Sequence, residues 1–276
     1  MPRVYAPGLI SPGALEPSPC LAAPVAIAAP ASVLRGVTSK PPPVIAHPAA
    51  TVILLRENQD GCETLLVRRN AQLSFHGGAW VFPGGRIEPE DYAAAGDPHD
   101  IVVAGRHAAV REAWEEAGIR ISHPDLRLFS RWVTPEEAPK RFDTLFFVAR
   151  AGSDRVRIDG GEIHEHRWLR PEEALALQQP GEFDLPPPTF VTLCQLAEHR
   201  TVADILAAPP PGPLDPFVPR LHLIPEGACS VYPGDVAYGS GDIDQPGPRH
   251  RLWMTGSGWR YERTAAESNR DNGDAS

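Results

Sequence analysis

The eight residues REAWEEAG, from Arg111 to Gly118, constrain this chain more than any other stretch, because they place three glutamates close together. At 100° per residue, Glu112, Glu115 and Glu116 share one helix face about 100° wide. The opposite face carries a mostly apolar stripe that would contact the core: Val103, His107, Val110, Trp114 and Ala117. Since Gly118 is typical of a helix end, the sequence predicts a helix whose last two turns point the acids away from the packing surface.

These acids stand where a helix tolerates negative charge poorly. Like charges three and four residues apart repel, and negative charge near a C-terminus opposes the helix dipole. A solvated surface is the ordinary explanation for an acidic face, but a cation would offset this charge directly. The turn-rich segment FPGGRIEPED, Phe82 to Asp91, adds acids upstream, and Mg²⁺ binds carboxylate oxygens from such turns and helix faces. The two segments together predict one acidic site.

The same residues resemble the signature of the Nudix hydrolases, which reads G, five residues, E, seven residues, R-E-apolar-x-E-E-x-G-apolar. The matching positions are Gly85, Arg111, Glu112, Ala113, Glu115, Glu116, Gly118 and Ile119. Two features depart from it: Asp91 stands where the family has Glu, and 19 residues instead of seven precede Arg111. The 12 extra residues are expected in a longer loop at Tyr92 to Asp100, since its Gly and Pro would break a helix. Glu88 or Glu90 then remains an alternative to Asp91.

The resemblance implies a Mg²⁺- or Mn²⁺-dependent hydrolase and gives the clustered residues roles. Glu115 and Glu116 would be the main metal ligands, with Glu112 a further ligand or a base. Arg111 would hold the acids in place by ion pairing, and Asp91 would belong to the same catalytic group. A diphosphate carries negative charge on both sides of its bridging oxygen, so a metal is needed to screen the phosphates and activate water.

A more distant acid often completes the metal site in this family. Glu162 lies at a suitable separation and is the expected ligand, with Glu165 as its competitor. His164 and His166 alternate with charged residues as on a strand. They are expected to be ordinary strand residues, because a hard cation prefers oxygen ligands.

The substrate is indicated by segments outside the signature. Leu65 to Gly85, Arg141 to Phe147 and the insertion resemble the coenzyme A and acyl-CoA diphosphatase branch, which releases 3′,5′-ADP and 4′-phosphopantetheine or its acylated form. The expected substrate-binding residues are Arg68, Arg69, Gly84, Gly85 and Arg141. Arginines bind phosphate oxygens in a bidentate manner, but neighbouring strand residues face opposite sides, so only one of Arg68 and Arg69 can face the site. Pairing of Arg141 with Asp143 is the structural alternative.

Three other functions stay open. Hydrolysis of ADP-ribose or another nucleoside diphosphate sugar is favoured by Pro135, which lies 16 residues past Ile119, where ADP-ribose-cleaving members carry a proline. A nucleotide-binding module without catalysis is disfavoured, because the three glutamates are intact. RNA-directed cleavage lacks the expected basic surface with aromatic residues.

Strand-like and helical patterns indicate an α+β fold, and their order resembles the Nudix fold, an α/β/α sandwich with a mixed sheet. Runs at 50–57 and 63–69 are joined by NQDG, which is typical of a hairpin turn. Further strands are expected at 79–82, 126–133, 144–149 and 164–169, and helices at 171–178 and 189–199. The predicted organisation is a Pro/Ala-rich disordered tail at 1–48, a Nudix domain at 49–200, a β-rich extension packed on it at 201–264, and a disordered tail at 265–276.

Composition limits the partners and the location. The net charge of −9 argues against a general nucleic-acid binder, but a metal would still allow a small nucleotide substrate. Prolines interrupt the one long uncharged run, so no membrane span is expected. The four cysteines form no C-x-x-C pair, which favours a reducing, cytoplasmic setting. Self-association as a homodimer is left open.

Overall fold

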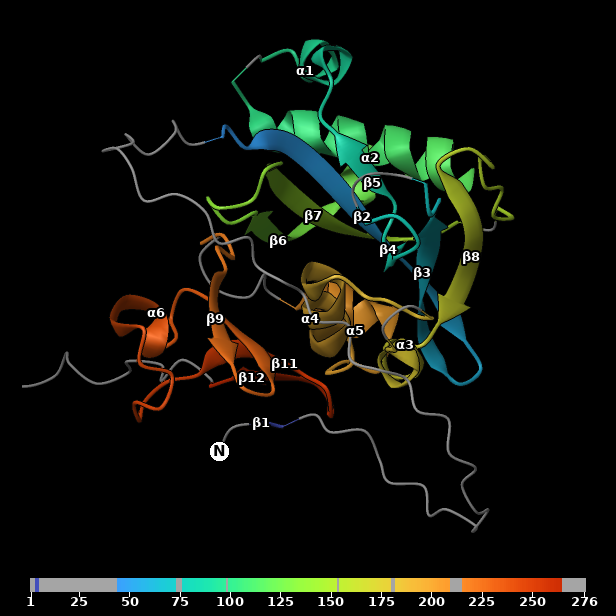
Figure 1. Ribbon diagram of the computed structural model, residues 1–276. Helices are drawn as coiled ribbons and strands as arrows, with labels where there is room; N and C mark the ends of the chain where they lie inside the picture. The colour runs from blue at the N-terminus through green and yellow to red at the C-terminus, as the bar shows by residue number, and fades with distance from the viewer. Residues whose placement is uncertain are drawn as a thin grey trace, which may run out of the picture.

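The computed structural model describes residues 3–4, 44–72, 76–97, 99–152, 154–179, 182–208 and 215–264. Two β-sheets and two groups of helices form four layers, in the order long helix, large sheet, short helices, small sheet (Figure 1). Most of the two tails expected to be disordered, 1–48 and 265–276, lies outside the described residues. Within the described residues, no helix is both long and apolar enough to cross a bilayer.

The large sheet is mixed, as the sequence predicts. Its central strand β2 (His47–Asn58) forms a hairpin with β3 (Gly61–Arg69) through the expected turn and runs parallel to β7 (Phe142–Arg150). The remaining strands are β4 (Trp80–Val81), β5 (Gly84–Arg86), β6 (Arg127–Val133) and β8 (Ile163–Leu169). Strand β5 contains the glycine pair of the acidic site and pairs with β2, so this glycine pair is held at the centre of the sheet. Strand β8 pairs with β3.

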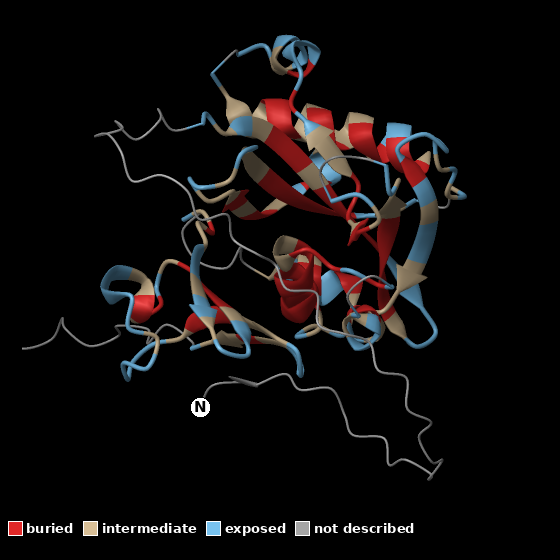
Figure 2. Ribbon diagram, in the orientation of Figure 1, coloured by how far each residue is buried: buried red, intermediate tan, exposed pale blue. Residues whose placement is uncertain are grey.

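Helices cover both faces of this sheet. On one face lie α1 (Pro89–Ala95), α2 (Ile101–Ala117) and a 3₁₀ turn, η1 (His123–Asp125). On the other lie α3 (Pro171–Leu177), α4 (Pro187–Leu196) and α5 (Val202–Ala207). Helix α4 is buried over most of its length between the two sheets (Figure 2). The α/β/α arrangement and the expected helices near 171 and 189 are confirmed, whereas α5 was not predicted.

Most strands of the small sheet come after the large domain in the chain. Its order is β1-β12-β11-β10-β9, with every pairing antiparallel. The strands are β1 (Arg3–Val4), β9 (Arg220–Ile224), β10 (Gly227–Val231), β11 (His250–Thr255) and β12 (Gly258–Arg263), with the short helix α6 (Ala237–Ser240) beside them. One hydrophobic cluster contains residues of both sheets and of α4, so the small sheet packs onto the large domain.

The core face of α2 is predicted only in part: Ala117 is buried as expected, but most of the predicted stripe is not. Trp114 is 47% exposed, and the residues buried against the sheet are mainly small ones: Ala104, Gly105, Ala108, Ala109, Ala113 and Ala117. The helix lies so close to β7 that a methyl group on Gly105 would meet the Leu145 side chain at 3.0 Å. Only small residues fit there, and the acids Glu112 and Glu116 are consequently buried at the edge of this face instead of pointing away.

The insertion is ordered differently from the expected loop. Part of it forms the end of α1, which stops at Gly96 in the left-handed conformation with φ of 76°. Helix α2 then starts afresh, with the Asp100 side chain accepting hydrogen bonds from the first-turn amides of Val102 and Val103. The break at Gly96 and the intact acidic helix agree with the prediction, whereas no sequence pattern predicts α1.

Candidate active site

The end of α2 places its acids in two environments. Gly118, with φ of 66°, ends the helix by donating its amide back to the last turn. In the turns before it, Glu112 and Glu116 are only 8% and 6% exposed, whereas the Glu115 side chain reaches solvent. Two carboxylates are therefore held in the protein and one stands at the rim.

The glycine pair of β5 allows the helix to approach the sheet. The Gly84 amide donates to Glu116 Oε2 over 2.9 Å. A Cβ atom on Gly85 would lie 2.2 Å from Glu112 Oε1, and one on Gly84 would lie 2.6 Å from the Ala50 carbonyl oxygen. No side chain fits at either position, so both residues need to be glycine for the buried acids to lie here.

Arg111 joins the helix acids to α1. Its Nη1 lies 2.7 Å from Glu112 Oε1 and 2.9 Å from Glu115 Oε2, and its Nη2 lies 3.0 Å from Asp91 Oδ2. Asp91 is buried and also accepts the backbone amide of Glu88. Of the three candidate acids, Asp91 is the one whose contact with Arg111 the described residues show, whereas Glu88 and Glu90 are exposed; the part of Asp91 in the site stays a prediction.

Arg69 closes the other side of the cluster. Its guanidinium lies 3.8 Å from Glu116 Oε1 and 3.5 Å from Glu162 Oε2. Arg68 turns away, as strand alternation requires, and pairs with Glu165 at 3.5 Å. Of the two expected distant acids, Glu162 thus lies beside the cluster, and Glu165 is engaged with Arg68 and Arg167.

The remaining candidates lie apart from these contacts. Arg141 donates to the backbone oxygens of Thr134 and Val44, and Asp143 pairs with Arg131 instead. The structural alternative, an Arg141 to Asp143 pair, is therefore wrong, and substrate binding by Arg141 stays a prediction. His164 and His166 are exposed strand residues, as expected.

Burial leaves the acids electrostatically unfavourable. Burial, supplemented by the charge of Glu112, raises the pKa of Glu116 from 4.5 to about 8, although the Gly84 amide and Arg69 act in the opposite direction. Burial likewise raises the pKa of Glu112, against the hydrogen bond from Arg111. Glu162 adds to both increases, which is consistent with its place beside the cluster. The pKa of Arg111 is raised because hydrogen bonds to the acids outweigh its burial.

The donor atoms fit a hard divalent cation. In the described parts of the chain, no three His, Cys, Asp or Glu side chains already converge as a metal shell. Arg111 and the Gly84 amide instead hold the buried carboxylates. Among the described residues, five carboxylates, those of Asp91, Glu112, Glu115, Glu116 and Glu162, pair with two guanidinium groups, those of Arg69 and Arg111. A dication would offset this excess, and oxygen ligands are those that Mg²⁺ and Mn²⁺ prefer.

Some contacts of the site had no sequence signal. The Gly84 amide and the Arg86 carbonyl oxygen, which accepts from Arg111 Nη2 over 2.8 Å, act through the backbone. Their side chains therefore give no indication of the role. Trp80 offers no free aromatic surface for an adenine or an acyl chain, since it is 1% exposed and stacks on Phe183 in the core.

Comparison with known proteins gives consistent matches. The model of the NUDIX domain family matches residues 46–189. A putative nudix hydrolase 7 from Caenorhabditis elegans is 27% identical over 55% of this chain and 61% of its own length. The human acyl-coenzyme A diphosphatase NUDT19 is 31% identical over 41% of this chain and 32% of its own length. The match thus spans less than two thirds of either relative.

A solved structure shows the same fold. The NUDIX hydrolase of Alicyclobacillus acidocaldarius superposes with a TM-score of 0.53 and 25% identity. The superposition covers 61% of this chain and 99% of the bacterial one.

Proposed function

This chain belongs to the Nudix hydrolases, which act on phosphoanhydride bonds, and we propose that it cleaves coenzyme A or acyl-CoA in a divalent-metal-dependent reaction. The products would be 3′,5′-ADP and 4′-phosphopantetheine or its acylated form. The observation that carries the proposal is the gathering of Glu112, Glu115 and Glu116 around Arg111 and the Gly84–Gly85 pair. This cluster contains more carboxylates than the guanidinium groups that pair with them.

Each residue of the cluster has a proposed part. Glu115 and Glu116 would be the main metal ligands, Glu112 a further ligand or the base that takes a proton from water, and Glu162 the acid that completes the set. Arg111 positions Glu112 and Glu115 and is itself held by Asp91. Nudix hydrolases generally use Mg²⁺ or Mn²⁺, and such an ion would screen the phosphates and favour a hydroxide nucleophile.

The substrate assignment rests on two supports. The segments Leu65 to Gly85 and Arg141 to Phe147 resemble the coenzyme A branch, and a similar human protein is named an acyl-CoA diphosphatase. Arg69 lies where an anionic substrate would meet the acids, between Glu116 and Glu162. With a metal on the carboxylates, its guanidinium would be released to bind phosphate oxygens in a bidentate manner.

The competing substrate is ADP-ribose, favoured by Pro135 alone. Pro135 begins a turn after β6, in which the Ala138 amide donates to the Pro135 oxygen over 3.2 Å. This turn leads to Arg141 and β7, so the loop between β6 and β7 would contact either substrate. The position of Pro135 in the sequence does not distinguish CoA from ADP-ribose as the substrate. The identity of the reaction products does.

Product identification tests the proposal. The protein is incubated with Mg²⁺ or Mn²⁺ and with equal concentrations of CoA, an acyl-CoA, ADP-ribose and NADH. The products are separated by chromatography and identified by mass spectrometry. We expect 3′,5′-ADP and the matching pantetheine phosphate from wild type and almost none from Glu116→Gln, with Glu165→Gln as the matched control. If AMP and ribose 5-phosphate are the main products, the substrate is ADP-ribose and the CoA assignment is wrong. Tight nucleotide binding without turnover would indicate a binding module.

A further inference from the structure

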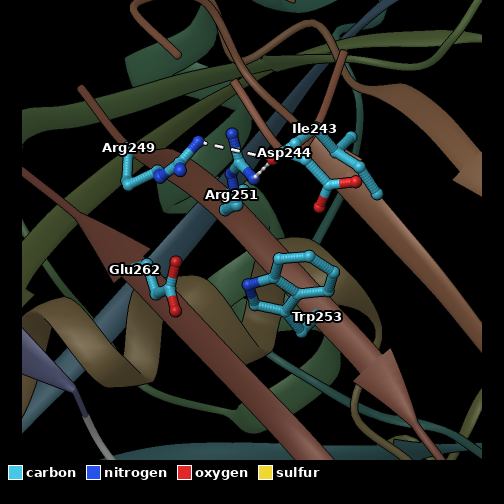
Figure 3. A pocket seen from close by; sticks show the side chains of 6 residues that line it. All are labelled: Ile243, Asp244, Arg249, Arg251, Trp253 and Glu262. Atoms are coloured by element: carbon cyan, nitrogen blue, oxygen red, sulfur yellow. Dashed lines mark hydrogen bonds between the residues drawn. The ribbon is translucent and has the colours of Figure 1, made fainter. Parts of the chain in front are cut away.

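A cavity of about 350 Å³ lies on the small sheet, away from the acidic cluster. Its lining side chains come from β11, β12 and the segment that precedes β11: Ile243, Asp244, Arg249, Arg251, Trp253 and Glu262 (Figure 3). The acidic cluster lies at α2, beyond the large sheet (Figure 1). Cavities of this size accommodate small-molecule ligands. The proposed hydrolysis does not involve this cavity.

One wall of the cavity is rigidly built. Arg251 is 1% exposed, and its Nη2 and Nε lie 2.6 and 2.8 Å from the two carboxylate oxygens of Asp235. Its Nη1 donates to the Ile243 carbonyl oxygen over 2.6 Å, which fixes the neighbouring segment. The charge of Arg251 is therefore compensated within the protein, and its function here is to hold the wall in shape.

Two hydrogen-bond donors at the cavity lack strong partners. Trp253 Nε1 is buried without an acceptor, and it is the one such polar atom on a cavity-lining residue among the residues the structure describes. Arg249 makes a single long side-chain bond, 3.4 Å to the Ile243 oxygen, and no described carboxylate pairs with it. A buried N–H group without an acceptor is energetically unfavourable. Both donors would be satisfied by an anionic acceptor.

The acids of the lining define the other half of the ligand. Glu262 is paired with Arg260, and Asp235 with Arg251, so both are compensated. The side chain of Asp244 has no partner among the described residues and is exposed at the cavity. In Figure 3 the indole nitrogen of Trp253 faces the space bounded by Arg249, Arg251 and Glu262. The uncompensated charges are thus one guanidinium and one carboxylate.

We infer that this cavity is a second ligand site, which takes a small molecule carrying both an anionic group and hydrogen-bond donors. Its phosphate or carboxylate group accepts from Trp253 Nε1 and Arg249, and its amino or hydroxyl groups donate to Asp244. The walls made by Arg251 and its partners limit the ligand to about the size of an amino acid or a nucleoside monophosphate.

The indole N–H resonance of Trp253 tests this inference. In ¹⁵N-labelled protein, Trp253→Phe identifies the signal, and the other tryptophan signals report whether the fold is kept. Inorganic phosphate, AMP and L-glutamate are added separately, with a chelator present to keep the acidic cluster metal-free. We expect AMP or glutamate to shift the Trp253 signal in a saturable way and Arg249→Gln to weaken that binding roughly tenfold, the effect of losing one charge-assisted hydrogen bond.

The remaining outcomes decide the matter. If none of the three compounds moves the signal, or if Arg249→Gln leaves the shift unchanged, there is no anion site here. If phosphate binds as tightly as AMP and glutamate do, the donor half of the ligand is wrong. If Asp244→Asn selectively weakens glutamate or AMP but not phosphate, the full assignment holds.

Discussion

Two arginine–carboxylate centres of this protein differ in charge balance. At the small sheet, Arg251 and Asp235 form a one-to-one pair whose side chains are 1% and 0% exposed. Asp235 accepts further hydrogen bonds from the amides of Ala237 and His250, so its oxygens are fully used. At the end of α2, Arg111 is shared among three carboxylates and is 27% exposed.

The pKa shifts show what the difference means. Burial alone would raise the pKa of Asp235, but the hydrogen bonds from Arg251 and the amides outweigh it and lower the pKa. Burial raises the pKa of Glu112 and Glu116 despite their partners. A balanced buried pair is a structural element, whereas an excess of buried carboxylates is stable only with a proton or an added cation. Charge balance, more than burial, therefore separates the proposed active site from the structural pair.

The largest effect is expected from Glu116→Gln. The change removes a proposed metal ligand, so turnover should fall by about 10²–10⁴-fold. The metal-free protein should not be destabilised, because a neutral amide resembles the protonated carboxyl that the site favours. Steady-state turnover and thermal unfolding in a chelator measure the two effects. Near-normal turnover would remove Glu116 from the site, and a large loss of stability would make it a structural acid.

The opposite pattern is expected at the balanced pair. Asp235→Asn leaves Arg251 buried without its counter-charge and should lower the free energy of unfolding by about 3–5 kcal/mol. Turnover per folded molecule should stay near wild type, since the pair lies on the small sheet. Denaturant unfolding and turnover well below the unfolding temperature measure these quantities. Adding Arg251→Met should recover part of the stability; a loss of turnover in fully folded protein would contradict the distinction.

The third test uses pH. Because the pKa of Glu116 is raised from 4.5 to about 8, its protonated form is favoured in the folded state. The corresponding stability is complete below pH 4.5 and is lost as the pH rises through about 8. Unfolding temperatures of the metal-free protein should therefore fall across this window more for wild type than for Glu116→Gln. Saturating Mn²⁺ should reduce the difference, and parallel curves without metal would contradict the assigned burial effect.

The sequence predicted elements better than their faces. Alternating apolar strands, the NQDG turn and Gly118 mark boundaries that local chemistry determines, and these were confirmed. The buried face of α2 was predicted only in part, because Trp114 counts strongly in a hydrophobic period and alanines count weakly. The outcome depended on how closely α2 approaches β7 at Gly105, and this distance is a property of the packed structure.

The site was predicted in the same partial way. The signature brought Arg111 and its neighbouring glutamates together, because they share one helix. Placing Asp91 required α1, whose last turn lies in the insertion and which has no matching sequence pattern. The choice between Arg68 and Arg69 depended on strand register, including an irregularity between these two residues where β3 pairs with β8. Long-range geometry of this kind is not contained in spacing along the chain.

The smallest effect is expected at the edge of the acidic cluster, where Glu162 and Glu165 provide a matched pair. Glu162 lies 3.5 Å from Arg69, but its side chain is 62% exposed, so solvent weakens its contribution. Glu162→Gln should weaken Mn²⁺ binding by a few-fold to about tenfold, less than the loss of a buried ligand. Glu165→Gln, which loses only surface pairs with Arg68 and Arg167, should leave Mn²⁺ binding unchanged. Calorimetric titration of both variants compares them under equal conditions. A larger loss in Glu165→Gln would mean that β8 turns its other acid toward the metal, and the excess of charge around Arg69 would then have to be reassigned.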